Sequence, residues 1–204
     1  MKVKTHGRWL SCFGVLAFLF LVPGSVRAED LQWRVRVGLT YANGVSKIGD
    51  ALQNYYESQG YDVSKFVWPV GLTLSGGPEW DFGNKAGALG LEARVGPTVF
   101  VFTSGAVREN NVLLPVGGGL RYTFLPDSAV SPYLRGGASY VACFGNHISE
   151  KTVGLDGAVG CEFMRNKRVG FGVEAGWNTA EVEAYYRSVK PIGFNASVYA
   201  SFKI

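Results

Sequence analysis

Most of the chain alternates between apolar and polar residues, the pattern of a β-strand whose two faces meet different surroundings. In residues 31–42, LQWRVRVGLTYA, every second position from Leu31 to Tyr41 is apolar, and the positions between them include Arg34 and Arg36. The same alternation recurs in seven further segments, which span residues 66–75, 87–102, 111–125, 132–144, 151–164, 168–179 and 192–202. The pattern therefore predicts eight strands and an all-β fold.

Two stretches depart from this period. Apolar residues in 43–65 recur at helical spacing, which predicts a long loop that carries a short amphipathic helix. Gly76, Gly77 and Pro78 predict a bulge or bend after the second strand, because proline cannot donate to a sheet ladder. The connections after strands two, four and six are short, whereas those after strands one and seven are long. This asymmetry is typical of bacterial outer-membrane barrels.

Three observations decide which face of the strands lies inside. Aromatic residues of the apolar face gather near strand ends, as they do where a membrane barrel meets lipid headgroups. The polar face is rich in glycine, which suits the inside of a narrow eight-stranded barrel. Arginines occupy mid-strand positions of the polar face, whereas the lysines after residue 28 lie in loops or near strand ends. The predicted aromatic girdle comprises Trp33, Tyr41, Phe66, Trp68, Tyr122, Phe124, Trp177 and Phe202.

The mid-strand arginines share the polar face with carboxylates. A confined network favours arginine, because its planar guanidinium binds carboxylates through two hydrogen bonds and stays charged. We therefore predict that the arginines point into the lumen and that lipid surrounds the apolar face. A soluble periplasmic barrel with an apolar cavity is the alternative, and it has the opposite orientation. The predicted ion-pair network comprises Arg34, Arg36, Glu92, Arg94, Arg121, Arg135, Asp156, Glu162 and Glu174.

The N-terminus predicts export. A basic start precedes 13 apolar residues, Leu10 to Val22, and small residues at Val26 and Ala28 offer a cleavage site. This is the layout of a secretory signal peptide over 1–28, followed by a barrel domain over 29–204. Four of the 20 basic residues and none of the 16 acidic residues lie in the signal, so the mature chain has no net charge. The basic pI is therefore no evidence of nucleic-acid binding.

The signal peptide, LQWRVRVGLTYA, the eight alternating segments and the closing FNASVYASFKI together resemble the small eight-stranded outer-membrane β-barrel family. That family includes the transmembrane domain of OmpA and OmpX-like surface proteins. The resemblance covers residues 31–204 and implies an antiparallel up-and-down transmembrane barrel in the outer membrane of a Gram-negative bacterium. Its members usually end on a phenylalanine that the assembly machinery recognises, whereas here Phe202 is followed by Lys203 and Ile204.

One cluster of residues raises the possibility of catalysis. His147 and Ser149 in FGNHISEK, with Glu162 further on, are similar to the serine and histidine of lipid A deacylase barrels. In that family the pair lies on the penultimate strand, and here that strand contains no histidine. We therefore expect no enzymatic activity and keep the hydrolase as an alternative. Cys143 and Cys161 fall on opposite faces, so we expect two free thiols, and no residues have the spacing of a metal site or a cofactor site.

The sequence thus predicts a structural or surface-interaction protein whose lumen is filled by ion pairs. A narrow solute channel is a second alternative. The expected partners are outer-membrane lipid, lipopolysaccharide and the assembly machinery, with no nucleic acid. Loop 43–65, which contains Tyr55, Tyr56 and Tyr61, is the expected contact surface for an unidentified partner.

Overall fold

The computed structural model describes residues 31–63, 70–82, 87–104, 107–145, 149–184 and 187–204. For residues 100, 102–104, 107, 149 and 187 it describes the backbone alone. The predicted signal peptide over 1–28 lies outside the described residues. So do Phe66 and Trp68 of the predicted girdle, and His147.

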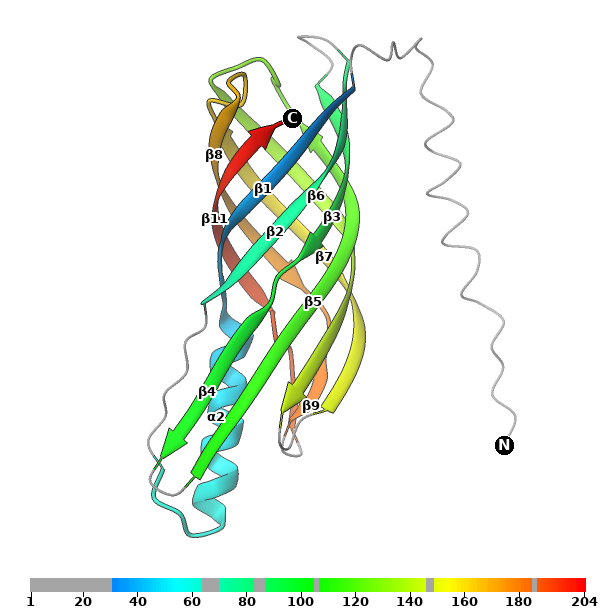
Figure 1. The fold of residues 1–204 in the computed structure, drawn as a ribbon. Helices are drawn as coiled ribbons and strands as arrows, with labels where there is room; N and C mark the ends of the chain where they lie inside the picture. Colours follow the sequence, from blue (N-terminus) through cyan, green and yellow to red (C-terminus); the bar gives the residue numbers. More distant parts are fainter. Residues whose placement is uncertain (1–30, 64–69, 83–86, 105–106, 146–148, 185–186) are drawn as a thin grey trace, which may run out of the picture.

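Eight antiparallel strands of the described chain close into a barrel (Figure 1), which confirms the predicted all-β fold. The barrel closes where β1 pairs with β11, and the third strand is divided into β3 and β4, which both pair with β5. The barrel strands are β1 (Leu31–Ala42), β2 (Val70–Asp81), β3 (Ala88–Val95) with β4 (Thr98–Ser104), β5 (Val107–Thr123), β6 (Val130–Gly145), β7 (Ser149–Phe163), β8 (Val169–Asn178) and β11 (Phe194–Lys203).

The apolar face of the strands points outward. Trp33 is 53% exposed, whereas the side chain of its neighbour Arg34 is 3% exposed. Along β8 every second residue is buried and every residue between is exposed. The alternative of a soluble barrel with an apolar interior is therefore wrong, because its alternation would have to be inverted.

The second and third strands differ from their predicted limits. Strand β2 runs on to Asp81, and Gly76 lies opposite Ala93 in the same register that places Glu79 opposite Gly90. No residue is inserted, so the predicted bulge is wrong. The interruption lies instead in the third strand, between β3 and β4, where the amide of Gly96 donates to the carbonyl of Pro115 at 3.1 Å.

The wall of the barrel is much taller on one side than on the other. Strands β5, β6 and β7 have 17, 16 and 15 residues, whereas β8 and β11 have 10 each. In Figure 1, β4 to β7 continue past the rest of the barrel at the end that carries the helix. The turns after β5 and β7 lie at the opposite end, beside the C-terminus.

A 16-residue helix, α2 (Asn43–Ser58), follows β1 directly and confirms the helix predicted in loop 43–65. A short hairpin of β9 (Val182–Ala184) and β10 (Arg187–Val189) replaces the loop expected over 180–190. Helix and hairpin pack together against the inner faces of β5 and β6. We call this apolar group the mouth cluster; it contains Ala42, Val45, Ile48, Leu52, Val63, Leu113, Val141, Cys143, Ala180, Val182, Ala184 and Val189.

In the described part of the chain no helix, α2 included, is both long and apolar enough to cross a membrane. Both cysteines of the described chain are free thiols. Cys143 is buried in the mouth cluster, and Cys161 is half-buried on the outer face of β7.

The predicted girdle residues that the structure describes all lie on the outer face. Tyr122 is half-buried and packs edge-to-face on Phe124 at 4.8 Å between ring centroids. Trp33 and Tyr41 are eight positions apart on β1, so they are separated by ~26 Å along the strand. Because barrel strands tilt by roughly 40°, this spans roughly 20 Å of the apolar band, which is roughly 25 Å tall in membrane barrels. The exposed members are Trp33, Tyr41, Phe124, Trp177 and Phe202.

Candidate functional site in the barrel lumen

The structure brings the predicted ion-pair residues together inside the barrel. Each lies at an inward-facing position of its strand, because the period of two places alternate residues on the same face. They come from β1, β3, β5, β6, β7 and β8, so the closure of the barrel, rather than any local motif, assembles them. Together with Glu79 and Arg165, described below, they form what we call the lumen network.

Glu162 of β7 lies at the centre of the lumen network and is fully buried. The Nη2 atom of Arg121 lies 2.7 Å from its carboxylate, and the hydroxyl of Ser201 donates to the same group. Arg34, Arg36 and Arg165 lie within 3.7 Å. A carboxylate can remain charged inside a protein only when such partners replace the water that it loses.

Two members of the lumen network escaped the sequence analysis. Glu79 lies 3.3 Å from Arg34 and also pairs with Arg36, but the sequence analysis ended the second strand before Pro78. Arg165 lies in the turn after β7, where no strand period applies. The left-handed backbone of Met164, with φ at 53°, accompanies a turn that folds back over the lumen. Arg165 is 1% exposed there and lies 2.6 Å from Glu79.

A second group of charges lies around Glu174 of β8. The Nη2 atoms of Arg94 and Arg135 lie 2.6 Å and 3.2 Å from its Oε1 atom, and the hydroxyl of Tyr133 donates to its Oε2 atom at 2.9 Å. Arg135 also pairs with Asp156. Glu92 joins the two groups, because it lies 3.3 Å from Arg36 of the first group and 3.8 Å from Arg94 of the second.

The lumen network carries one more positive charge than negative charge. Its described members are six guanidinium groups and five carboxylates, which are Arg34, Arg36, Arg94, Arg121, Arg135 and Arg165 with Glu79, Glu92, Asp156, Glu162 and Glu174. Most arginines contact more than one carboxylate, and this sharing disperses the excess charge.

Tyrosine rings fill the space between the charged groups. The guanidinium of Arg121 lies 3.4 Å from the ring centre of Tyr133, a cation–π contact. A Cβ atom on Gly160 would lie 2.3 Å from the Tyr133 ring, and one on Gly172 would lie 2.1 Å from the ring of Tyr199. The glycines of the polar face therefore make room for lumen side chains, as the sequence pattern suggested.

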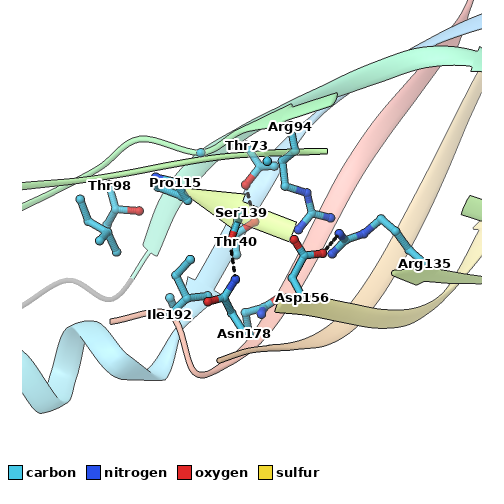
Figure 2. Close-up of a pocket in the computed structure, with 15 residues that line it drawn as sticks. Thr40, Thr73, Arg94, Thr98, Pro115, Arg135, Ser139, Asp156, Asn178 and Ile192 are labelled. Atoms are coloured by element: carbon cyan, nitrogen blue, oxygen red, sulfur yellow. Dashed lines mark hydrogen bonds and ion pairs between the residues drawn. The ribbon is translucent and has the colours of Figure 1, made fainter. Parts of the chain in front are cut away.

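A cavity of about 50 Å³ with both polar and apolar lining residues, which we call the chamber, lies between the lumen network and the mouth cluster (Figure 2). Figure 2 shows Arg94, Asp156 and Arg135 grouped on one side of it. The amide of Asn178 donates to the hydroxyl of Ser139 at 2.7 Å. The polar lining comprises Thr40, Thr73, Thr98, Ser139, Asn178 and Asn195, and the apolar lining includes Ala42, Leu113, Pro115 and Ile192.

Helix α2 begins directly after Ala42, which lines the chamber, and its apolar face packs into the mouth cluster. Val45, Ile48 and Leu52 are fully buried in the mouth cluster. Near the end of the helix the hydroxyl of Tyr56 donates to the carboxylate of Glu109 on β5. Burial, and then this hydrogen bond, raise the pKa of the Tyr56 phenol above its usual value, so the phenol stays neutral and remains a donor.

The structure contradicts the catalytic alternative in one respect. Ser149 and Glu162 are 13 positions apart on the same strand, which separates them by ~43 Å. Glu162 is also engaged by lumen arginines, so it does not lie beside Ser149 as the acid of a catalytic triad would. Among the described residues no group of three His, Cys, Asp or Glu side chains could hold a metal ion.

Comparison with known proteins agrees with this architecture. Residues 14–202 match the sequence model described as the outer membrane protein beta-barrel domain. OprG from Pseudomonas aeruginosa is similar in structure, with a TM-score of 0.50 and 14% identity over 85% of this chain and 95% of that chain. At this identity the likeness shows the fold alone.

Two further solved structures are similar over most of their length. For Outer Membrane Protein W of E. coli the TM-score is 0.45 and the identity 16%, over 87% of this chain and 100% of that chain. For Ail of Yersinia pestis the TM-score is 0.48 and the identity 14%, over 86% and 99%. No curated protein matches the sequence.

Proposed function

Since the chain belongs to the family of outer membrane β-barrel domains, whose strands span the membrane, we propose that it is a sealed, non-enzymatic barrel that displays a helical cap at the cell surface. Its place is the outer membrane of a Gram-negative bacterium, reached by export with the signal peptide 1–28. The aromatic girdle contacts lipid headgroups and lipopolysaccharide, and the assembly machinery recognises the last strand.

The observation that carries the proposal is that the lumen is obstructed at two levels. Arg34, Arg36, Arg121, Arg165, Glu79 and Glu162 fill it near the turns, and all of them are less than 5% exposed. At the other end the mouth cluster closes it with the apolar face of α2. An eight-stranded barrel has space inside only for its own side chains, so this filling leaves no wide path.

Conductance of the purified chain in planar lipid bilayers tests the seal. We expect no sustained current, whereas a porin reconstituted in the same way conducts. A steady current from the wild-type chain would refute the seal and favour the narrow solute channel instead.

The cap offers aromatic side chains to a partner. Tyr56 packs edge-to-face on both Tyr55 and Tyr61, with ring centroids 5.3 Å and 6.0 Å apart. Tyr61 is 53% exposed. Rigid, amphipathic rings of this kind are enriched at protein interfaces, because they bury area at a small entropic cost.

Labelling of intact cells tests which end of the barrel faces outward. A cysteine replaces Tyr61 in a background that carries Cys143→Ala and Cys161→Ala, and the reagent is a maleimide polymer too large for general porins. We expect Tyr61→Cys to react on intact cells. The matched variant Asp127→Cys, in the exposed turn after β5, should react only after the outer membrane is permeabilised. The reverse result would show that α2 faces the periplasm.

A further inference from the structure

The chamber contains hydrogen-bonding groups that the chain does not satisfy. Asn195 is 4% exposed, and its Oδ1 atom has no hydrogen-bond partner among the described residues. Within the described part of the chain, its amide nitrogen donates a single, long hydrogen bond of 3.5 Å to the carbonyl of Gly193. Arg94 also lines the chamber, and its buried Nε atom has no hydrogen-bond partner among the described residues either. One unpaired acceptor and one unpaired donor therefore belong to side chains that line the same cavity, where unpaired polar groups are costly.

The charges around the chamber balance. Arg94 and Arg135 contribute two positive charges, and both pair with Glu174, while Arg135 also pairs with Asp156. Two guanidiniums are thus paired with two carboxylates, of which Asp156 lines the chamber and Glu174 does not. A charged molecule that entered would leave one charge buried without compensation, so the electrostatics favour an uncharged molecule.

The size and the lining of the chamber limit the molecule further. A water molecule needs roughly 10–15 Å³ of such a cavity, so about 50 Å³ holds about three to five waters or one molecule with a similar number of heavy atoms. The hydroxyl and amide groups of the polar lining lie near Ile192, Leu113 and Pro115, which offer contacts for a methyl group.

We propose that the chamber is a binding site for small uncharged polar molecules, a class that includes water and short amides such as acetamide. The bound molecule donates a hydrogen bond to Oδ1 of Asn195 and accepts one from the Nε–H of Arg94. An amide has both groups in one plane. This site is independent of whether the barrel conducts and of any partner at the cap.

Solution NMR of the mature chain refolded in lipid nanodiscs, with nitrogen-15 in its asparagines, tests the proposal. The probes are water itself, observed by transfer of magnetisation to the side-chain amides, and acetamide, added before refolding so that it is present when the barrel closes. The readouts are the side-chain signals of Asn195 and Asn178. The variant Asn195→Leu removes the free acceptor. Asn111→Leu is the matched control, because Asn111 is a buried amide without a hydrogen-bond partner in the described part of the chain and does not line the chamber.

We expect either cross-peaks from a long-lived water at Asn195 or saturable shifts with acetamide, and these outcomes distinguish the two sources of the ligand. In Asn195→Leu the apparent affinity for acetamide, read at Asn178, should fall at least tenfold, whereas Asn111→Leu should bind like the wild type. The absence of both signals in the wild type would overturn the proposal. If acetate or guanidinium ion causes shifts equal to those with acetamide, the argument from charge balance is overturned. This measurement uses the wild-type chain and so does not depend on the folding of any variant.

Discussion

Replacing Glu162 by glutamine removes one negative charge from the centre of the lumen network and keeps the size of the side chain. Four guanidiniums lie within 3.7 Å of this carboxylate, and Arg121 is the nearest at 2.7 Å. The removal of one partner from a buried ion pair costs about 3–5 kcal/mol, because the remaining charge stays buried without compensation. The four arginines keep contacts with Glu79 or Glu92, so we expect the lower end of this range, about 3 kcal/mol.

Urea unfolding of the chain in phospholipid vesicles, followed by tryptophan fluorescence, measures this loss of stability. The double variant Glu162→Gln/Arg165→Gln returns the lumen to an excess of one positive charge, so it should recover at least about 1 kcal/mol through coupling between the two sites. Glu181→Gln is the matched control. It removes a carboxylate that is 56% exposed and lies 3.4 Å from Lys190, and such a surface pair contributes about 0–1 kcal/mol. If Glu162→Gln unfolds at the same urea concentration as this control, the network does not stabilise the barrel as argued.

Three further predictions concern the lumen glycines and the cap. Gly172→Ala places a methyl group 2.1 Å from a lumen tyrosine ring and should cost about 1–3 kcal/mol in the same unfolding assay. Gly118→Ala, which meets no atom closer than 3.5 Å, should change stability little, and equal losses would contradict the account of glycine as room for rings. Leu52→Ala should weaken the docking of α2 by about 2–5 kcal/mol and so speed tryptic cleavage after the exposed Lys47; an unchanged cleavage rate would show that the mouth cluster does not hold the helix. Because the pKa of Tyr56 is raised in the folded cap, the phenol contributes stability that is complete below its unfolded pKa of about 10 and is lost as the pH rises above it. Tryptic cleavage after Lys47 should therefore become faster at alkaline pH in the wild type, and Tyr56→Phe should abolish this increase. If the increase persists in Tyr56→Phe, another group causes it.

The period of two in the sequence is sufficient for the fold and for the orientation of the wall. Arg34 and Arg36 alternate with Trp33 and Val35, and a strand offers only two faces, so one assignment fixes every strand. The same reasoning places Glu92 and Glu174 in the lumen. The face of each of these side chains can be assigned from its odd or even position within the strand, without knowing which residues lie beside it.

The residues that the sequence analysis missed lie where parity fails or was misread. Glu79 follows Gly76, Gly77 and Pro78, at which the sequence predicts a bulge or bend, although the register continues through them. Arg165 belongs to a turn whose conformation depends on a left-handed backbone at Met164, a feature without periodic signal. The docking of α2 depends on Leu113 and Val141, inward-facing residues of β5 and β6 that meet the helix only after the barrel has closed.

The unequal height of the barrel wall affects which molecules can reach α2, and from which side. A strand crosses a bilayer with about 9–11 residues, so the 17 residues of β5 extend roughly 20 Å beyond what the lipid requires. The long strands β5 to β7 extend beside α2 on one side of the barrel, whereas the short strands β8 and β11 do not reach as far along the helix (Figure 1). A large ligand, such as an antibody or the tail of a virus, would therefore approach the helix with the least steric hindrance from the side of β8 and β11.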